Sequence, residues 1–593
     1  MGRSDRIFFL VLAGAVWAYV IARAALVPLV HDECASLMWF VRSGEWLPYR
    51  AHWDANNHYL SSGIGILFTQ VFGESLITLR AGSVLAFMGY AWAAWRIGGH
   101  VHDRFVRAGL WAALLLCPFL LDFFSLFRGY GIEMACWLVA LDGLLRYWAS
   151  CSTRHMTQAL SGALIAVASI VALSPAWAIL LVLLVAHLWK HRERGTRRTV
   201  LVQCTALVLL GLLPFLYATG VAMELKRLGL LYHGSTDGFF LVTVTSLCHY
   251  VLGSGSGWAA LVIVLLVALS TAIGAVEVRR TKSLGSPLVL VNTVLWSDVL
   301  LRMLMATGMG VNFPEDRAAL HFVPLVLLSI AFVIERLALE HRRVAWASAL
   351  LLLLPVRTVL TANLDHTLFW PEQSVPTRFI DRLAELRRAS PRPLLIGAQH
   401  QLAMAWPVGV WLVGREAQPL QTVDFPNGPH DLRIVKGGFL GEASAGYHVI
   451  DSAKGPGLWL LERNRALEVN AITELWATER STRAEFAELA HLPDSLLRTG
   501  SILVEVDVPL TLASSSPDVR LVLEVNDAEG GKVFYDAIAP MVLSPDWAGH
   551  RMHWAWGLPI LPHAHRAIVY LYNPGRIAIS HGMARTVLSA IHG

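Results

Sequence analysis

The chain has 593 residues, of which 55% are hydrophobic and 15% are charged, and its formal net charge is +5 at pH 7. This composition excludes a single soluble domain, a disordered chain and a small disulfide-rich protein. The charge is unevenly divided, with 28 Lys and Arg against 19 Asp and Glu before residue 360, and 20 against 24 after it. The basic excess therefore lies among long apolar runs, where it sets membrane topology and does not indicate nucleic acid binding.

The first part of the chain contains many apolar runs, and a helix needs roughly 20 such residues to cross a membrane. We expect about eleven transmembrane helices, at residues 7–29, 74–98, 108–122, 130–149, 158–172, 176–189, 199–221, 258–276, 287–306, 318–336 and 344–360. The two short runs on either side of Ser174-Pro175 could instead form a re-entrant hairpin. The sequence thus predicts a multi-pass helical membrane domain over residues 1–360.

The Lys and Arg residues between these helices indicate the orientation, because cytoplasmic loops retain them. With the N-terminus inside, the inner segments hold sixteen basic residues and the outer segments hold six. An odd number of spans then places the part after residue 360 outside. The absence of any Asn-x-Ser/Thr sequon favours a bacterial cytoplasmic membrane over a secretory compartment.

The part after residue 360 divides into two regions. Residues 361–465 mix helix and strand signals, such as the amphipathic run Phe379–Arg388 and the apolar run Pro393–Gly397. Residues 466–593 alternate apolar and polar residues with period two, as in Val504–Val508 and Ala567–Tyr572, and contain turn residues at Asp527–Gly531. We expect an extracytoplasmic α/β region followed by a jelly-roll-like β-sandwich.

Three tryptophans stand out in the expected sandwich. Trp554 and Trp556 are two residues apart and so share one face of a strand, and Trp547 precedes them. We expect these side chains to belong to the sandwich core, because aromatic residues dominate core burial. A saccharide-binding platform is the alternative.

The first outer loop, about residues 30–73, carries the residues with the most chemistry. Asp32 and Glu33 directly follow the first span, so their carboxylates would lie at headgroup depth, where a lipid phosphate would be held. The alternative is an acidic pair that only caps a membrane helix. Asp54 and His58 could join them as metal ligands, but their spacing matches no known chelate, so we expect neither a metal nor a cofactor.

Two later segments complete a pattern. Phe127-Arg128-Gly129-Tyr130-Gly131 opens one span, and Pro314–Leu325, which contains Arg317, precedes another. Together with the acidic pair and the aromatic loop, they resemble the GT-C glycosyltransferases, in particular the protein O-mannosyltransferase and aminoarabinose-transferase superfamily. The resemblance covers residues 1–360. The resemblance implies that the sugar donor is a polyprenyl phosphate sugar and that transfer occurs on the outer face, without a nucleotide sugar. The inner segments agree with this, because they contain nothing that resembles a nucleotide-phosphate loop.

The resemblance also assigns roles. Asp32 resembles the catalytic carboxylate of the family, with Glu33 as its neighbour. The donor phosphate calls for guanidinium or ammonium groups, and the candidates are Arg128, Arg317, Lys226 and Arg227. The candidates for positioning the substrates are His31, Asp54, Asn57, His58 and Tyr130. At the place of His58 the aminoarabinose branch has a Lys-Pro-Pro pattern, from which this chain departs.

Several of these residues also have a structural interpretation. Arg128 could pair with Asp122, and Arg317 could pair with Asp316 or Glu315, because interfacial arginines commonly reach toward the membrane surface. Asp298 and Arg302 are four residues apart on one face of a span. We expect this last pair to be a structural ion pair.

Three functions remain open from the sequence. The preferred one is an inverting membrane glycosyltransferase that moves a sugar from a polyprenyl phosphate to a glycan, glycolipid or protein of the cell envelope. The second is a carrier or flippase for a lipid-linked saccharide, although no inverted repeat is visible. The third is a non-catalytic assembly protein with a glycan-binding tail.

The predicted topology can be tested by thiol labelling in intact cells that lack an outer barrier. A cysteine at Ser515 should react with an impermeant reagent, because the tail is expected outside, whereas a cysteine at Thr196 should not. The opposite labelling pattern would contradict the topology.

Overall fold

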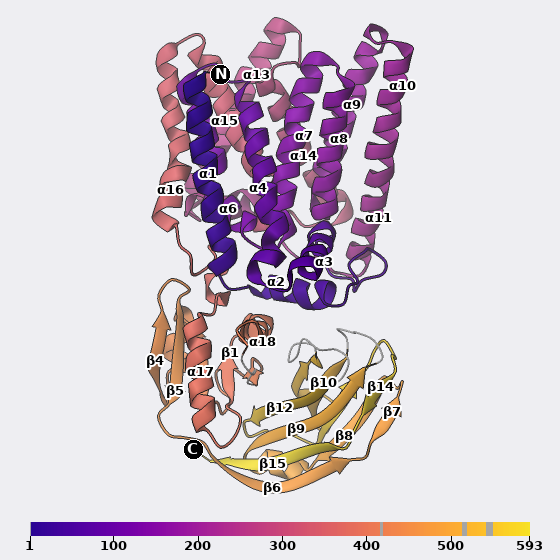
Figure 1. The fold of residues 1–593 in the computed structure, drawn as a ribbon, viewed down its shortest axis with the longest axis vertical. Helices are drawn as coiled ribbons and strands as arrows, with labels where there is room; N and C mark the ends of the chain where they lie inside the picture. The colour runs from indigo at the N-terminus through magenta and orange to yellow at the C-terminus, as the bar shows by residue number, and fades with distance from the viewer. Residues whose placement is uncertain (1, 415–418, 513–518, 541–549, 593) are drawn as a thin grey trace. The chain divides into compact units, whose positions relative to one another are not determined.

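The computed structural model describes residues 2–414, 419–512, 519–540 and 550–592. Trp547 and Ser515 lie outside these residues. Contacts within the chain define two compact units (Figure 1): a helical unit, Met1–Leu26 with Trp46–Leu364, and a second unit, Val27–Glu45 with Asp365–Gly593. The division thus falls four residues after the boundary expected at 360, and the segment with Asp32 and Glu33 belongs to the second unit.

The helical unit contains a helix at each of the eleven expected positions. The helices are α1 Arg3–Leu26, α4 Leu76–Gly98, α5 Arg104–Leu115, α6 Pro118–Phe124, α7 Gly129–Ser150, α8 Thr153–Ser169, α9 Ser174–His191, α10 Arg197–Ala206, α11 Leu213–Arg227, α13 Gly257–Thr281, α14 Pro287–Met309, α15 Phe322–Ala338 and α16 Leu353–Thr361. Two shorter helices, α3 Tyr59–Phe72 and α12 Thr245–Leu252, lie in regions expected to be loops. Their apolar runs are too short to cross a membrane and therefore gave no signal of a span.

Seven helices among the described residues are long and apolar enough to cross a membrane, or eight if α5 and α6, bent by 50°, form one span. Three of the expected spans are not among these helices, and they correspond to α7, α8 and α15. Helices α8 and α15 have 17 residues each, or about 26 Å. Helix α7 has 22 residues but carries Glu133, Asp142 and Arg146. The chain is a multi-pass membrane protein.

Helix α7 tolerates its charged residues because it is buried among other helices. Asp142 forms ion pairs with Arg146, at 2.8 Å, and with Arg96 of α4, at 2.7 Å. Helices α7 and α8 approach closely through glycines, since a Cβ at Gly143 would lie 2.6 Å from the backbone nitrogen of Ala159. Small residues at such contacts are typical of helix packing in membranes, where close backbone approach replaces the hydrophobic driving force.

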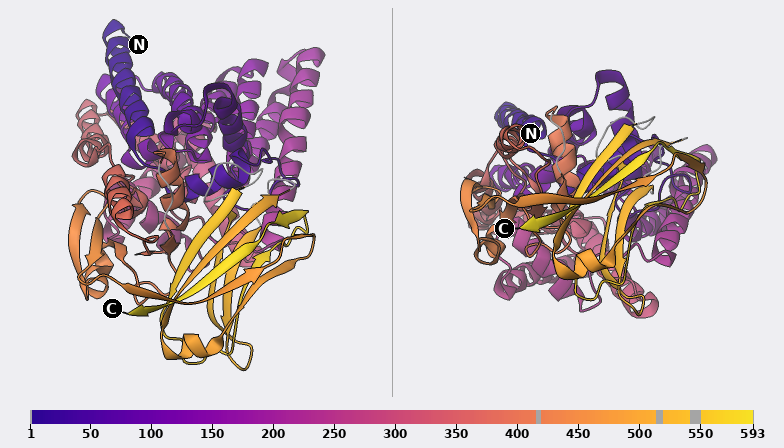
Figure 2. Two further views of the ribbon diagram at one scale, coloured as in Figure 1. Left: turned by 60° about the horizontal axis from the view of Figure 1, so that its bottom comes forward. Right: turned by 90° about the horizontal axis from the view of Figure 1, so that it is seen from below.

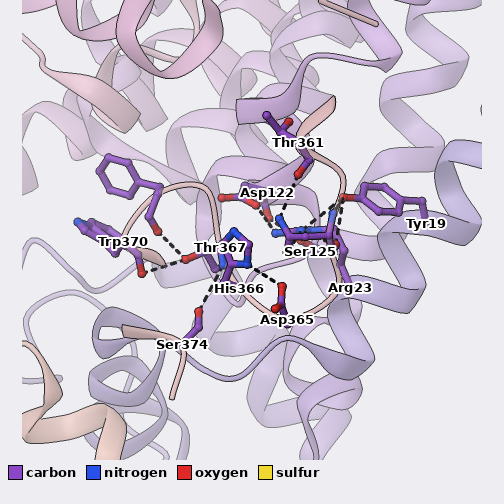
Figure 3. A network of polar contacts seen from close by, with 12 residues as sticks. Tyr19, Arg23, Asp122, Ser125, Thr361, Asp365, His366, Thr367, Trp370 and Ser374 are labelled. Carbon is purple, nitrogen blue, oxygen red and sulfur yellow. Dashed lines mark hydrogen bonds and ion pairs between the residues drawn. The ribbon is translucent and has the colours of Figure 1, made fainter. Parts of the chain in front are cut away.

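The end of α1 and the end of α16 lie together in the helical unit (Figure 3). The Arg23 guanidinium forms a buried ion pair with Asp122 of α6 and donates hydrogen bonds to the Asn363 backbone carbonyl, at 2.8 Å, and side-chain oxygen, at 3.0 Å. The Tyr19 hydroxyl donates to the same carbonyl at 3.2 Å. The chain therefore leaves the helical unit for residues 27–45 and for residues 365–593 at the same end.

The second unit begins with the helix α2, His31–Ser36, and a mixed α/β region. Its five-stranded sheet has the order β2-β1-β3-β5-β4, in which β1 is parallel to β2 and β3, and β5 is antiparallel to β3 and β4. The expected amphipathic helix is α17, Thr377–Ala389, and the expected apolar strand overlaps β1. The remaining bounds are β1 Ile396–Ala398, α18 Leu402–Leu412, β2 Leu420–Gln421, β3 Leu432–Lys436, α19 Leu440–Ala443, β4 Tyr447–Ala453 and β5 Leu458–Arg463.

The expected β-sandwich follows (Figure 2). One sheet has the order β11-β10-β13-β8, and the other has the order β6-β15-β9-β14-β7, with β12 also paired to β9. The elements are β6 Glu468–Ala477, β7 Arg480–Thr482, β8 Phe486–Leu492, α20 Asp494–Thr499, β9 Ser501–Leu512, β10 Arg520–Asn526, β11 Lys532–Ile538, β12 His550–Leu558, β13 Arg566–Tyr572, β14 Ile579–His581 and β15 Ala584–His592. Residues of both sheets form one hydrophobic core. Trp554 and Trp556 are buried in this core, as expected.

Candidate functional site

The residues with the most specific geometry surround the imidazole of His58, which immediately precedes α3. The Gly129 backbone N–H, at the first residue of α7, donates a hydrogen bond to Nδ1 of His58 at 2.6 Å. Nη2 of Arg128 lies 3.0 Å from Nε2 of the same ring. His58 and Arg128 are both buried. The site therefore joins the beginning of α3 to the beginning of α7.

Both ring nitrogens of His58 face groups that can only donate, the Gly129 N–H at Nδ1 and the Arg128 guanidinium at Nε2, whereas a neutral imidazole has one acceptor nitrogen and one N–H. A neutral ring that accepts from Gly129 at Nδ1 carries its proton on Nε2, beside the donor Nη2 of Arg128. Two neighbouring N–H donors are complementary to an anionic oxygen that accepts from both.

Glycine at position 129 is required by the packing of this site. A Cβ there would lie 2.8 Å from Nδ1 of His58 and 2.8 Å from the carbonyl oxygen of Ser169. The Ser169 hydroxyl donates to the Gly129 carbonyl at 2.8 Å, and the Ser83 hydroxyl donates to the Arg128 carbonyl at 3.0 Å. Helices α4 and α8 therefore fix the backbone at the beginning of α7.

Tyr130 and Arg317 complete the cluster. The Tyr130 ring packs edge-to-face on His58, with ring centroids 5.0 Å apart, and the Arg128 guanidinium lies 6.0 Å from the Tyr130 ring. The pKa of His58 is held well below its ordinary range. Burial is the largest cause, followed by the positive charges of Arg128 and Arg317. The structure thus brings together four predicted residues: His58, Arg128, Tyr130 and Arg317.

The turn that carries Arg317 is itself unusual. Asp316, which precedes Arg317, has a left-handed backbone with φ of 49°, and its N–H donates to the Ser246 hydroxyl at 3.0 Å. Burial, followed by the neighbouring Glu315, raises the pKa of Asp316 to about 6, against a smaller opposing effect of Arg317. Helix α12 thereby supports the turn that presents Arg317.

The other predicted residues of the helical unit have mainly structural contacts. Asn57 donates to the Trp46 carbonyl at 3.1 Å and accepts from the Ser62 hydroxyl at 3.1 Å. Asp54 accepts from the Asn56 N–H at 2.6 Å, which closes a turn of the loop. These contacts fold the loop that leads to His58.

The two further basic candidates lie at the end of α11. Arg227 is exposed and forms an ion pair with Glu224 at 2.6 Å. Lys226 donates to the Met309 carbonyl at the end of α14. These contacts are typical of residues that stabilise helix ends. The binding of a donor phosphate by Lys226 and Arg227 stays a prediction.

His31, Asp32 and Glu33 form the first turn of α2 in the second unit. The Glu33 carboxylate accepts from the Val30 N–H at 3.1 Å, so it caps α2 and not a membrane helix. The His31 N–H donates to the Gln373 side chain at 2.9 Å, and its Nδ1 lies 3.1 Å from the Gln401 carbonyl oxygen. These bonds hold α2, and with it Asp32, against the α/β region.

The expected structural pair of Asp298 and Arg302 is confirmed at 3.0 Å. His321 joins it, with Nε2 2.9 Å from the Asp298 carboxylate, which the sequence did not predict. Asp122, considered as a partner of Arg128, forms an ion pair with Arg23.

Sequence reasoning also missed Arg80, Ser83 and Ser169. Arg80 is buried inside the span α4 and donates to the Ala24 carbonyl at 3.1 Å. Its position in an apolar run was a signal, since charged residues within spans commonly mark function. The two serines gave no signal, because their partners are backbone carbonyls distant in sequence.

Within the described ranges, no group of three or more His, Cys, Asp or Glu side chains could hold a metal ion.

Comparison with known proteins finds similarity only at the level of structure, because no family model matches the chain and no curated protein matches it significantly. ArnT from Cupriavidus metallidurans bound to undecaprenyl phosphate is 12% identical, with a TM-score of 0.40 over 78% of this chain and 98% of that one. Arabinosyltransferase EmbB from Mycobacterium smegmatis is 11% identical, with a TM-score of 0.36 over 98% of this chain and 64% of that one. The Archaeoglobus fulgidus oligosaccharyltransferase is 10% identical, with a TM-score of 0.39 over 95% and 94%.

Substitution of Gly129 tests the packing of the site. Gly129→Ala should destabilise the protein by about 1–3 kcal/mol, because the added methyl group overlaps His58 and Ser169. Gly89→Ala is the matched control, since a Cβ at this position of α4 would meet nothing within 4 Å. Thermal unfolding in detergent measures both variants. Equal melting temperatures would contradict the described packing.

The pH dependence of stability tests the state of His58. Its pKa is lower in the folded protein than the value of about 6.5 in an unfolded chain, so the unfolded state binds the extra proton as the pH falls. Stability from this residue is therefore present above about pH 6.5 and is lost below it. Between pH 7 and pH 5, the melting temperature should fall further for the wild type than for His58→Asn. Parallel curves would show that His58 titrates normally.

Proposed function

We propose that this protein is an inverting membrane glycosyltransferase that takes its sugar from a polyprenyl phosphate. The acceptor molecule is a glycan, glycolipid or protein of the cell envelope, and transfer occurs on the outer face of a bacterial cytoplasmic membrane. This proposal combines the sequence resemblance to GT-C enzymes with the chemistry of the described side chains. It requires no nucleotide sugar and no metal.

The observation that carries the proposal is the cluster of the buried His58 and Arg128 with the half-buried Arg317. His58, at the beginning of α3, lies 3.0 Å from Arg128, at the beginning of α7, and both arginines lower the pKa of its imidazole. Guanidinium groups that lie beside a neutral imidazole favour an anionic ligand. A phosphate within reach of the membrane is such a ligand, and its oxygens suit the fork of an arginine.

In the proposed reaction, Asp32 takes the proton from a hydroxyl group of the acceptor molecule. The hydroxyl oxygen forms a bond to the anomeric carbon of the sugar while the bond from that carbon to the phosphate oxygen breaks. The polyprenyl phosphate leaves with the bonding electrons, and Arg128, Arg317 and the Nε2–H of His58 stabilise its negative charge. Glu33 maintains the first turn of α2 and so positions Asp32.

Transfer of a labelled sugar from a polyprenyl-phosphate donor in proteoliposomes tests these roles. Asp32→Asn preserves shape but removes basicity, so it should reduce transfer on the order of 10²- to 10⁴-fold with donor binding unchanged. Arg128→Ala and Arg317→Ala should weaken donor binding as well, because each removes a phosphate contact. Glu33→Gln should have an intermediate effect.

Arg104→Ala is the matched control, because Arg104 is an exposed arginine at the beginning of α5, within the segment expected inside. It should retain wild-type transfer and donor binding. Wild-type activity of Asp32→Asn would refute the assignment of the base. Failure of the wild-type protein with every lipid-linked donor, together with retained donor binding, would favour a carrier.

A further inference from the structure

The α/β region of the second unit has the topology of a ligand-binding sheet. Strand β1 lies between β2 and β3 and is parallel to both. From β1 the chain passes through α18 to β2 on one side, whereas β3 continues on the other side toward β5 and β4. In open sheets of this kind, ligands bind in the crevice at the carboxyl ends of the strands where the direction of the connections changes. Here that place is the carboxyl end of β1.

Polar residues occupy this place. Strand β1 ends at Ala398 and is followed at once by Gln399, His400 and Gln401. The amide nitrogen of Gln399 is buried and has no hydrogen-bond partner in the part of the chain that the structure describes. A buried donor without a partner costs free energy, and a bound ligand can supply the missing acceptor.

Helix α2 brings His31 to the same place. It packs against α18, and Nδ1 of His31 lies 3.1 Å from the carbonyl oxygen of Gln401. The rings of His31 and His400 are 6.2 Å apart. Because Asp32 follows His31 in the first turn of α2, the proposed base is one residue away from this place.

The β-sandwich adjoins the same end of the α/β sheet. Gln421 of β2 donates to the Ala555 carbonyl of β12 at 3.2 Å, which joins the two sheets within the second unit. Asp536 of β11 accepts from the indole N–H of Trp556 at 2.9 Å and from the Ala537 N–H at 2.9 Å. Burial raises the pKa of the Asp536 carboxyl, while the bonds from Trp556 and Ala537, and then the nearby His400, oppose this rise. A carboxylate held in this way has oxygen lone pairs left for a ligand.

We propose that a crevice lies at the carboxyl end of β1, with His31, Gln399, His400 and Asp536 around it, and that it binds the hydroxyl groups of a saccharide acceptor. Imidazole, amide and carboxylate groups are mixed hydrogen-bond donors and acceptors, which suits hydroxyl groups. None of these four side chains is an arginine or lysine, so the crevice is not built for a phosphate. That the bound saccharide is the acceptor molecule rests on the proposed function. Saccharide binding itself can be measured without transfer.

The binding test uses the full chain in nanodiscs and saturation-transfer difference NMR. The probes are the methyl glycosides of glucose, galactose, mannose, rhamnose and arabinose, with a Ser/Thr-containing peptide as the competing class of acceptor. At least one glycoside should bind the wild-type protein. His400→Ala and Asp536→Asn should each weaken that binding about tenfold, the expected loss for a hydrogen bond to a charged or well-positioned group.

His491→Ala is the matched control, because His491 is an exposed histidine of β8 beside Glu488. It should bind the glycosides like the wild type, and thermal unfolding should show that all three variants are folded at the temperature of the binding measurement. Unchanged binding in both His400→Ala and Asp536→Asn would overturn the proposal, as would binding of the peptide in place of every glycoside. Absence of any glycoside binding would overturn it too.

The transfer assay separates this proposal from the proposed function. The two crevice variants should raise the KM for the acceptor molecule and leave the KM for the lipid donor unchanged. Glycoside binding that depends on His400, in a protein that transfers no sugar, would refute the proposed function and support the crevice. Normal transfer with an unchanged acceptor KM in both variants would support the function and refute the crevice.

Discussion

A single guanidinium group fixes where the chain leaves the helical unit. Arg23, near the end of α1, forms a buried ion pair with Asp122 and donates to the carbonyl and the side chain of Asn363 (Figure 3). Removing one partner from a buried pair costs roughly 3–5 kcal/mol, because the other charge stays buried without compensation. The ends of α1, α6 and α16 are thereby held together. Both segments that form the second unit consequently start from one end of the bundle.

The cluster around His58 illustrates how rigid helices prepare a polar site in an apolar protein. Its imidazole accepts from the first N–H of α7 and lies beside Arg128, whereas serines of α4 and α8 hold the adjoining carbonyls. These hydrogen bonds to fixed backbone groups hold the ring in one orientation. For the proposed phosphate, such a prepared site would reduce the reorganisation that binding requires.

The two units divide the chemistry of the proposed reaction. The helical unit provides the groups suited to a lipid phosphate. The second unit provides α2 with the proposed base Asp32, together with the proposed crevice, whose imidazole, amide and carboxylate groups suit hydroxyls. Membrane physics gives a reason for this division: a phosphate on a long apolar chain stays at the bilayer surface, whereas a hydrated saccharide is handled by a domain that lies in water.

The sequence by itself determined the class of structure and most of the elements. Hydropathy located helices at eleven positions, and the period-two pattern located β9 and β13, because burial in lipid or in a sandwich selects apolar residues along each stretch of chain. The turn Phe127–Gly131 indicated a site through its resemblance to a GT-C motif. Charge, together with the turns that carry them, marked Arg128 and Arg317 as candidates.

Only the tertiary structure decided which of these residues meet. His58 and Arg128 are 70 positions apart, and their contact depends on the packing of α3 against α7, which no local pattern encodes. The same holds for the partner of Asp122, which is Arg23, and for the loop segment Val27–Glu45, which belongs with the tail. Side chains such as Gln399 and Asp536 look ordinary in the sequence. Their proposed role follows from strand order, because ligands of open sheets bind where the connections between strands diverge.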